Sequence, residues 1–319
     1  MDMLSRVGDA LYWMSRYLER AEHTARVLEI HLGLQLESFC TSSQKHWERM
    51  ITSLGLEPPD GINDVDLIQW VCFDPSNRLS IVSCVSFARD NARQVREHTS
   101  SEMWEQINKL FHDVRSNAVQ EDWETEPTDF LRSVRDGAHL FQGITDSTMN
   151  HGEGWNFIQL GRYIERATSS AVLLDVHFEH FHPTGAATIN FEEHSEWIGL
   201  LKSLTAFEAY CKVYTADLKP ERIAEFLLLS EEFPHSIRFA VDQIDTVMKA
   251  LPRSSRGGGN RPALLAGKLR ATLCYTEMDE IAAVGMHEFL ETIESQCSQI
   301  HNAVHQVYID YPVDAAIEA

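Results

Sequence analysis

Apolar residues recur at spacings of three and four along most of this 319-residue chain, and no stretch alternates strictly between apolar and polar positions. Such spacings place side chains on one face of an α-helix, whereas a half-buried strand alternates with a period of two. The sequence also lacks the turn signals that would join two apolar runs into a hairpin. The pattern therefore predicts an all-α protein.

Breaks in the periodicity divide the chain into predicted helices. Pro, Gly, Asn and Asp gather at residues 57–61 and 149–154, and Ser100 precedes an apolar stripe in the position of a helix cap. The predicted helices cover residues 4–38, 42–54, 65–73, 80–97, 101–111, 125–146, 157–178, 191–209, 220–229 and 234–250, with a last helix that begins near Pro262 or Met278 and ends near Val307.

One segment occurs twice: residues 11–32 and 157–178 align without a gap at a constant offset of 146. The identical pairs are Arg16/Arg162, Tyr17/Tyr163, Glu19/Glu165, Arg20/Arg166, Ala21/Ala167, Ala25/Ala171, Leu28/Leu174 and His31/His177. A repeat of this length predicts two related halves that bring equivalent faces together across a pseudo-twofold axis. We therefore expect a single helical domain over residues 1–319, a multi-helix bundle with pseudo-symmetric halves at about 1–150 and 151–319.

Each copy of the repeat carries a charged ridge beside an apolar stripe. The ridge residues are Arg16, Glu19, Arg20, Arg162, Glu165 and Arg166. Because residues three and four apart share a helix face, the two ridges predict a lattice of Glu-Arg ion pairs close to the core. Alternatively, guanidinium groups left free would bind a carboxylate or phosphate, with Glu19 or Glu165 as a general base. We favour the structural lattice.

A second basic cluster consists of Arg89, Arg93 and Arg96, whose spacing keeps them on one helix face. Together with the arginines of the repeat they would line an anion-binding groove. The alternative, which we favour slightly, is pairing with the many acidic residues of the chain itself.

Composition excludes several classes of function. The chain has 27 Lys and Arg against 48 Asp and Glu, a net charge of −21, which disfavours nonspecific binding to nucleic acid or to anionic membranes. Its apolar runs are far shorter than the roughly 20 residues of a membrane span, and its first residues read as an amphipathic helix and not as a signal peptide. Six single cysteines suggest reduced thiols, so we expect a cytoplasmic protein.

Two further segments suggest chemistry only weakly. Residues 177–182 hold three histidines, but without the spacing of a helical zinc site, so we interpret them as a solvated helix end and predict neither a metal nor a cofactor. Residues 253–262 contain three arginines and three glycines. They would form a mobile loop that closes over an anion, or, as we favour, a plain linker. Signatures of nucleophilic hydrolases are absent from the sequence.

Several segments carry the resemblance to a known family. They are residues 11–26, 89–97, 100–108, 151–162 and 226–238, in this order along nearly the whole chain. This set resembles the bacterial Alpha-E family, named for its helical nature and its Glu-Arg motif. One departure is His235, where the family pattern carries Arg, so no role of that charge transfers to this chain.

The resemblance implies an all-α protein that is encoded beside, or fused to, a circularly permuted ATP-grasp ligase. A transglutaminase-like peptidase, and in some cases a proteasome-like peptidase, accompanies such pairs, a combination suited to making, modifying or trimming peptides. Two hypotheses follow. The first is a non-catalytic helical partner of an ATP-grasp amide ligase that presents a surface through the Arg/Glu ridge. The second is an enzyme that acts on a carboxylate or peptide held in a Glu/Arg-lined cleft.

Overall fold

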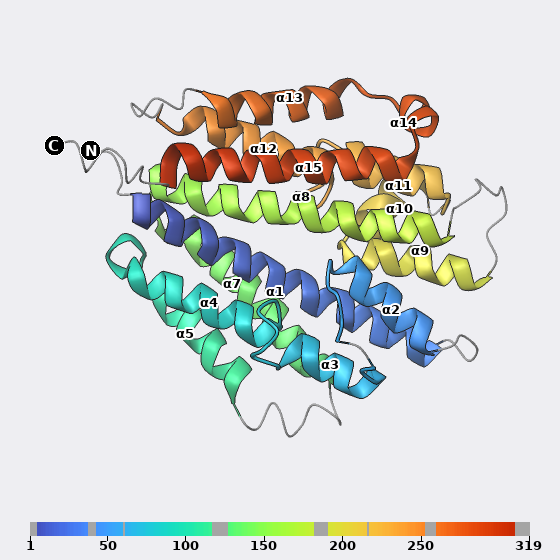
Figure 1. The fold of residues 1–319 in the computed structure, drawn as a ribbon, viewed down its shortest axis with the longest axis horizontal. Helices are drawn as coiled ribbons and strands as arrows, with labels where there is room; N and C mark the ends of the chain where they lie inside the picture. Colours follow the sequence, from blue (N-terminus) through green and yellow to red (C-terminus); the bar gives the residue numbers. More distant parts are fainter. Residues whose placement is uncertain are drawn as a thin grey trace.

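The computed structural model describes residues 5–37, 43–59, 61–116, 127–181, 191–215, 217–252 and 260–309, which form fourteen α-helices and no strand (Figure 1). The prediction of an all-α protein is confirmed. The α-helices are α1 (Ser5–Glu37), α2 (Ser43–Ser53), α3 (Asp64–Cys72), α4 (Ile81–Gln94), α5 (Ser101–Arg115), α7 (Pro127–Thr148), α8 (Glu153–Phe181), α9 (Phe191–Ser203), α10 (Phe207–Tyr214), α11 (Pro220–Leu229), α12 (Ile237–Ala250), α13 (Arg261–Tyr275), α14 (Met278–Val284) and α15 (Met286–Val304). A short 3-10 turn covers Arg96–His98, and a π-helical turn covers His305–Ile309.

Two long helices, α1 and α8, lie side by side through the middle of the molecule (Figure 1). Helices α4 and α7 pack against α1, and α5 covers both of them. Helices α12 and α15 pack against α8, and α13 covers both of these in turn. At one end, α9 packs against α1, and α2 packs against α8. The repeated segment of the sequence therefore forms the two central helices.

The central position of α1 buries far more than one apolar stripe. Leu11, Met14 and Leu28 are fully buried, as the periodicity predicts, but so are polar residues on the other faces, including Glu19 and Glu22. Buried apolar side chains from all layers join in one continuous cluster. No helix in the described parts of the chain is long and apolar enough to cross a membrane.

Helices α1 and α8 approach each other closely at Gly161. A Cβ atom added there would lie 2.3 Å from the backbone oxygen of Tyr12 and 2.4 Å from Oγ of Ser15. These distances are far inside van der Waals contact, so only glycine permits this separation of the two helices. The close approach brings the charged ridges of the two helices within reach of each other.

Two of the predicted helices are wrong in their extent. The predicted helix 191–209 breaks between α9 and α10, where Thr205 adopts a left-handed conformation with φ 54°. The predicted last helix is three helices, because Glu277 and Glu280 form a capping box that starts α14 and Gly285, with φ 108°, separates α14 from α15. These three breaks rest on backbone conformation and capping, which hydrophobic periodicity does not report.

Smaller differences have local causes. The predicted helix 80–97 ends at Gln94 and passes into the 3-10 turn, and the predicted helix 234–250 begins at Ile237, because the Ser236 hydroxyl caps it by accepting from Phe239 N. Ser100 caps α5 as predicted and accepts from Met103 N. The Arg- and Gly-rich residues 253–259, together with Cys40, lie outside the described residues; the other five cysteines are free thiols.

Substitution of Gly161 by Ala tests the close approach of the central helices. We expect Gly161→Ala to lower the free energy of unfolding by about 1–3 kcal/mol, since the new methyl group must push α1 and α8 apart. The matched control is Gly143→Ala in α7, where an added Cβ meets no atom within 4 Å. This control should stabilise the protein by about 0.4–1 kcal/mol, because alanine has less freedom in the unfolded chain. Equal effects of the two substitutions in denaturant unfolding would contradict the packing argument.

Candidate functional site

The Glu165 carboxylate binds two arginines across the interface between α1 and α8. Arg16 Nε donates to Oε2 at 2.7 Å, and Arg20 Nε donates to Oε1 at 2.5 Å. The Glu165 side chain is only 5% exposed. Burial alone would raise the pKa of Glu165, but the charges and hydrogen bonds of Arg16 and Arg20 lower it to about 2. Glu165 therefore stays ionised as the anchor of two cations.

The Glu19 carboxylate has the corresponding position on α1, with the helices exchanged. Arg166 Nε donates to Oε1 at 2.5 Å, Gln142 of α7 donates to Oε2 at 3.0 Å, and Arg162 Nε lies 3.7 Å from Oε2. Each pair of the first set thus has its counterpart in the second at the repeat offset of 146. The structure brings together all six ridge residues of the repeat.

The two sets differ in how the outer arginine is held. Arg16 also donates to the hydroxyl of Tyr12 at 3.4 Å, lies over the ring of Trp13 and is 3.3 Å from Nδ1 of His301, which in turn is 2.7 Å from the Tyr12 hydroxyl. Burial raises the pKa of Tyr12 to about 12, so it remains a neutral phenol. Arg162 lies over the ring of Tyr163, and in the described part of the chain no hydroxyl or imidazole is bonded to it as Tyr12 and His301 are to Arg16. Burial and the neighbouring charge of Arg166 lower the pKa of Arg162 from its ordinary value, in contrast to that of Arg16, which Glu165 raises.

A second charged group lies one turn farther along α1. Arg26 donates through Nε to Glu22 at 2.9 Å, and His139 of α7 lies 3.3 Å from the same carboxylate. Sequence reasoning did not find this group, although Glu22 and Arg26 are four residues apart on a helix, a spacing that favours an ion pair. Gln142 and His139 gave no signal, because their positions depend on how α7 packs.

His235, the departure from the family pattern, lies next to this group. Arg166 donates to the carbonyl of the preceding residue, Pro234, at 3.2 Å. Burial, followed by the charge of Arg166, holds the pKa of His235 well below its usual range. A neutral imidazole here adds no charge beside Arg166 and Arg26, whereas an arginine would place a further cation next to these two, which already pair with Glu19 and Glu22.

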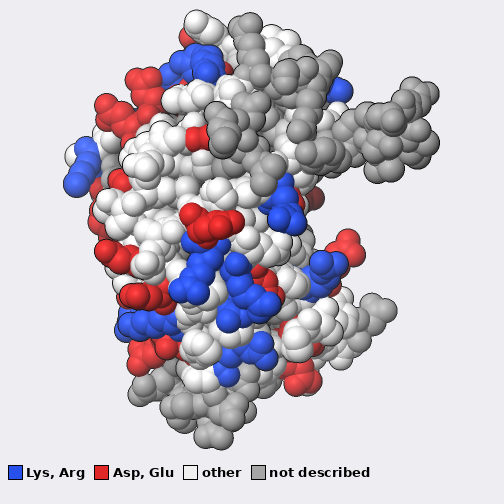
Figure 2. Space-filling model, turned by 90° about the vertical axis from the view of Figure 1, so that its left-hand side faces the viewer, with Lys and Arg blue, Asp and Glu red and all other residues white. Residues whose placement is uncertain are grey.

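The structure places the second basic cluster away from the central lattice. Both Arg89 and Arg96 contact side chains of α5. Arg89 lies over the ring of Phe111 and donates to Asn108, and Arg96 lies over the ring of Trp104. Arg93 is exposed. Across the described residues, no ion pair or hydrogen bond joins these three arginines to those of the repeat. Basic and acidic side chains are interspersed on the face shown in Figure 2, where charge of one sign does not form a continuous patch.

Histidines form a separate buried group between α1, α2, α8 and α9. Nδ1 of His31 is 3.1 Å from Nε2 of His46, and Arg49 donates to Glu196 at 2.6 Å beside them. His177 packs against the ring of Trp197. The expectation of a solvated helix end is therefore wrong for His177, which is buried, although His180 is exposed and His182 lies outside the described residues. In the described parts of the chain, no group of three or more His, Cys, Asp or Glu side chains could hold a metal ion.

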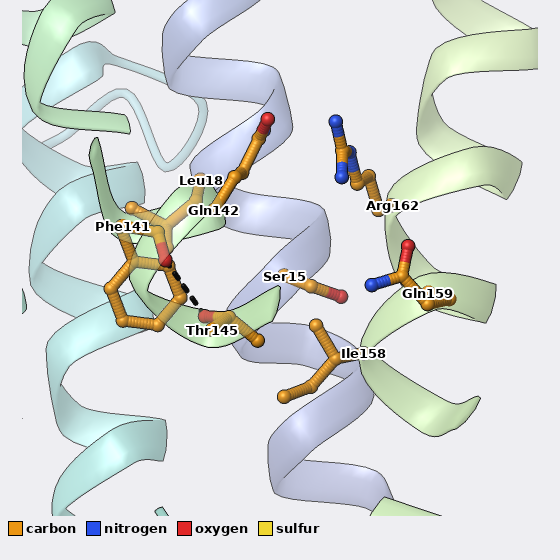
Figure 3. A pocket seen from close by; sticks show the side chains of 8 residues that line it. All are labelled: Ser15, Leu18, Phe141, Gln142, Thr145, Ile158, Gln159 and Arg162. Atoms are coloured by element: carbon orange, nitrogen blue, oxygen red, sulfur yellow. Dashed lines mark hydrogen bonds between the residues drawn. The ribbon is translucent and has the colours of Figure 1, made fainter. Parts of the chain in front are cut away.

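A small cavity opens beside the central lattice where α1, α7 and α8 meet (Figure 3). Its volume is about 20 Å³, room for about one water-sized group. It is lined by Ser15, Leu18, Phe141, Gln142, Thr145, Ile158, Gln159 and Arg162. Of the arginines of the repeat, Arg162 lines this cavity.

The chain belongs to the Alpha-E family, described as a predicted alpha-helical domain with a conserved ER motif, whose model matches residues 3–309. Both copies of the repeat contain such a Glu-Arg pair, Glu19-Arg20 and Glu165-Arg166. The chain is 23% identical over 329 aligned residues to uncharacterized proteins of Mycobacterium bovis and Mycobacterium tuberculosis, with 95% of this chain and 36% of each relative covered. It thus spans about a third of the length of these relatives. No solved structure matches the chain.

Removal of the Glu165 charge tests the lattice. We expect Glu165→Gln to lower the free energy of unfolding by about 3–5 kcal/mol, because it leaves the buried Arg16 and Arg20 without a counter-ion. The double variant Glu165→Gln, Arg20→Gln should cost less than the sum of its single variants, with a coupling energy of about 0.5–3 kcal/mol. Glu105→Gln, at an exposed position of α5, is the control and should change stability little. Additive single effects in chemical denaturation would argue against pairing.

The buried histidines predict a loss of stability in mild acid. Burial lowers the pKa values of His31 and His177 from 6.5 to about 3, and it also lowers those of His23 and His235. Below pH 6.5 the unfolded chain takes up protons that the folded protein cannot, so the stability that is present above this pH falls as the pH drops toward 3. The slope is at most about 1.4 kcal/mol per pH unit for each histidine.

This pH dependence is measured as the free energy of unfolding between pH 7.5 and 5, in the wild type and in two variants. His177→Phe should reduce the slope, and His180→Gln, at an exposed position on the same helix, should leave it unchanged. A slope that is unaffected by His177→Phe would show that this histidine takes up its proton in the folded state.

Proposed function

We propose that this chain is a non-catalytic, all-α accessory protein that binds an ATP-grasp amide or peptide ligase in a system for peptide synthesis or modification. The observation that carries the proposal is the state of the two ridge glutamates. Both are buried: Glu165 accepts from two arginines, and Glu19 accepts from Arg166 and Gln142, so they form part of the framework between α1 and α8. These ion pairs fix the position of the central helices. The helices packed around them therefore form a rigid surface, which suits a protein that binds a partner.

The alternative, an enzyme with Glu19 or Glu165 as general base, fits these contacts poorly. A general base works best when its pKa lies near the pH of the reaction, and it must reach the proton that it abstracts. The pKa of Glu165 is lowered to about 2, and both of its oxygens accept from arginines. Neither property suits proton abstraction from a substrate.

The arrangement of helices supports two pseudo-symmetric halves as the basis of this framework. Helix α1 with α4, α5 and α7 has the same pattern of neighbours as α8 with α12, α13 and α15. The serine caps of α4 and α12, Ser80 and Ser236, correspond as well. We infer that the halves arose from a repeated unit whose Glu-Arg ridges meet on a pseudo-twofold axis.

The partners are inferred from family membership and from the size of the relatives. The aligned region makes up 36% of the mycobacterial relatives, which leaves most of their length for other domains. We propose the ATP-grasp ligase as the direct partner, a transglutaminase-like peptidase and a proteasome-like peptidase as further members of the system, and the cytoplasm as its location. The small number of basic residues argues against nucleic acid and membrane partners.

Direct binding and kinetics test this function. The purified chain should associate with the ATP-grasp ligase encoded beside it, as measured by calorimetry and size-exclusion chromatography, and should change the kcat or KM of ATP-dependent amide formation by that ligase. Alone, it should not turn over peptides or carboxylates. Lack of association with the ligase would overturn the proposal. Turnover by the isolated chain would also overturn it, if folded Glu19→Gln and Glu165→Gln variants lose that turnover.

A further inference from the structure

The cavity between α1, α7 and α8 combines a cation with a short apolar wall. Figure 3 shows the ends of Gln142 and Arg162 on opposite sides at the same end of the cavity. Both side chains are partly exposed, whereas Ser15, Thr145 and Gln159 are buried deeper in it. Arg162 and Gln142 therefore form the mouth of a pocket whose interior offers hydroxyl and amide groups beside Leu18, Phe141 and Ile158.

Arg162 is the least neutralised arginine of the central lattice. Its Nε is buried, lies 3.7 Å from Glu19 and finds no hydrogen-bond acceptor among the described residues. Glu19 is held in this position by the hydrogen bonds that its two oxygens accept from Arg166 and Gln142. Four guanidinium groups share two carboxylates here, so the lattice has an excess of positive charge that an anion beside Arg162 would balance.

The equivalent space in the other copy of the repeat is filled by protein. There Arg16 lies against the rings of Tyr12 and Trp13, which occupy the positions of Ile158 and Gln159 at the repeat offset of 146. The smaller side chains of the second copy leave the cavity open on the Arg162 side. The pocket is thus a property of the residues around Arg162 and does not follow from the shared backbone arrangement.

We propose that Arg162 binds the C-terminal carboxylate of a peptide whose last residue is small, such as Gly or Ala. A guanidinium pairs with a carboxylate in a planar, bidentate geometry. A volume of about 20 Å³ admits a group the size of a methyl beside the wall of Leu18, Phe141 and Ile158, while the carboxylate pairs with Arg162 at the mouth. The peptide nature of the ligand rests on the proposed function, since an amide ligase acts on peptide carboxylates.

Binding of small probes to the full chain tests this assignment by calorimetry and ligand-observed NMR. N-acetylalanine should bind, and N-acetylalanine amide, which lacks the charge, should bind at least about 10-fold more weakly. Inorganic phosphate should also bind more weakly than N-acetylalanine. Failure of N-acetylalanine to bind at millimolar concentrations, equal binding of its amide, or tighter binding of phosphate would overturn the proposal.

Matched variants locate the binding in this pocket. Arg162→Gln should weaken N-acetylalanine binding by about 10-fold or more, whereas Arg93→Gln, the same change of charge on an exposed face of α4, should leave it unchanged. Arg162→Lys keeps the charge beside Glu19 and should fold even if Arg162→Gln does not; it should bind several-fold more weakly, because it lacks the planar pair of donors. Wild-type affinity in either Arg162 variant would overturn the assignment. Association with the ligase is measured separately. If the chain binds the ligase but N-acetylalanine does not bind at Arg162, the pocket assignment fails and the proposed function stands.

Discussion

Pairing of buried charges between α1 and α8 is the interaction on which the rest of the structure depends. A carboxylate removed from water is stable only where cations and hydrogen-bond donors replace its hydration. Glu19 and Glu165 find these groups on the opposite helix, so the two helices are held in one register and at one distance. Gly161 makes that distance attainable, and the outer helices then pack around a central pair whose relative position is fixed.

The same pairing limits the chemistry of the centre. Carboxylates that are saturated by arginines are poor bases, and guanidinium groups that are bound to carboxylates are poor ligands for substrates. The lattice nevertheless contains more cations than anions. Glu19 accepts from Gln142 and Arg166, and among the described residues Arg162 remains without a close partner, at the edge of the cavity between α1, α7 and α8. A ligand that binds the repeated ridge is therefore expected at Arg162 and not at Arg16.

Neutral polar residues surround the charged centre. His23 is buried and His235 is partly buried, and loss of hydration lowers the pKa values of both imidazoles, which keeps them uncharged at neutral pH. They supply polar contacts near the ion pairs without changing the balance of charge. The presence of His235 in place of an arginine fits this arrangement, since it lies close to Arg166 and Arg26.

The sequence by itself determined the helical class, most helix positions, the repeated segment and the candidate residues of the ridge, because these depend on local periodicity and on spacings within one helix. The breaks at Thr205 and Gly285 rest on backbone conformation, which the apolar pattern does not report, so only the structure shows them. Which arginine meets which glutamate was decided by tertiary structure alone, since the partners are about 150 residues apart. So were the contact from Gln142, the burial of His177 and the open space beside Arg162. All of these features depend on the distances between packed helices. The side-chain volumes at Gly161, Ile158 and Gln159 affect those distances only where the helices are in contact.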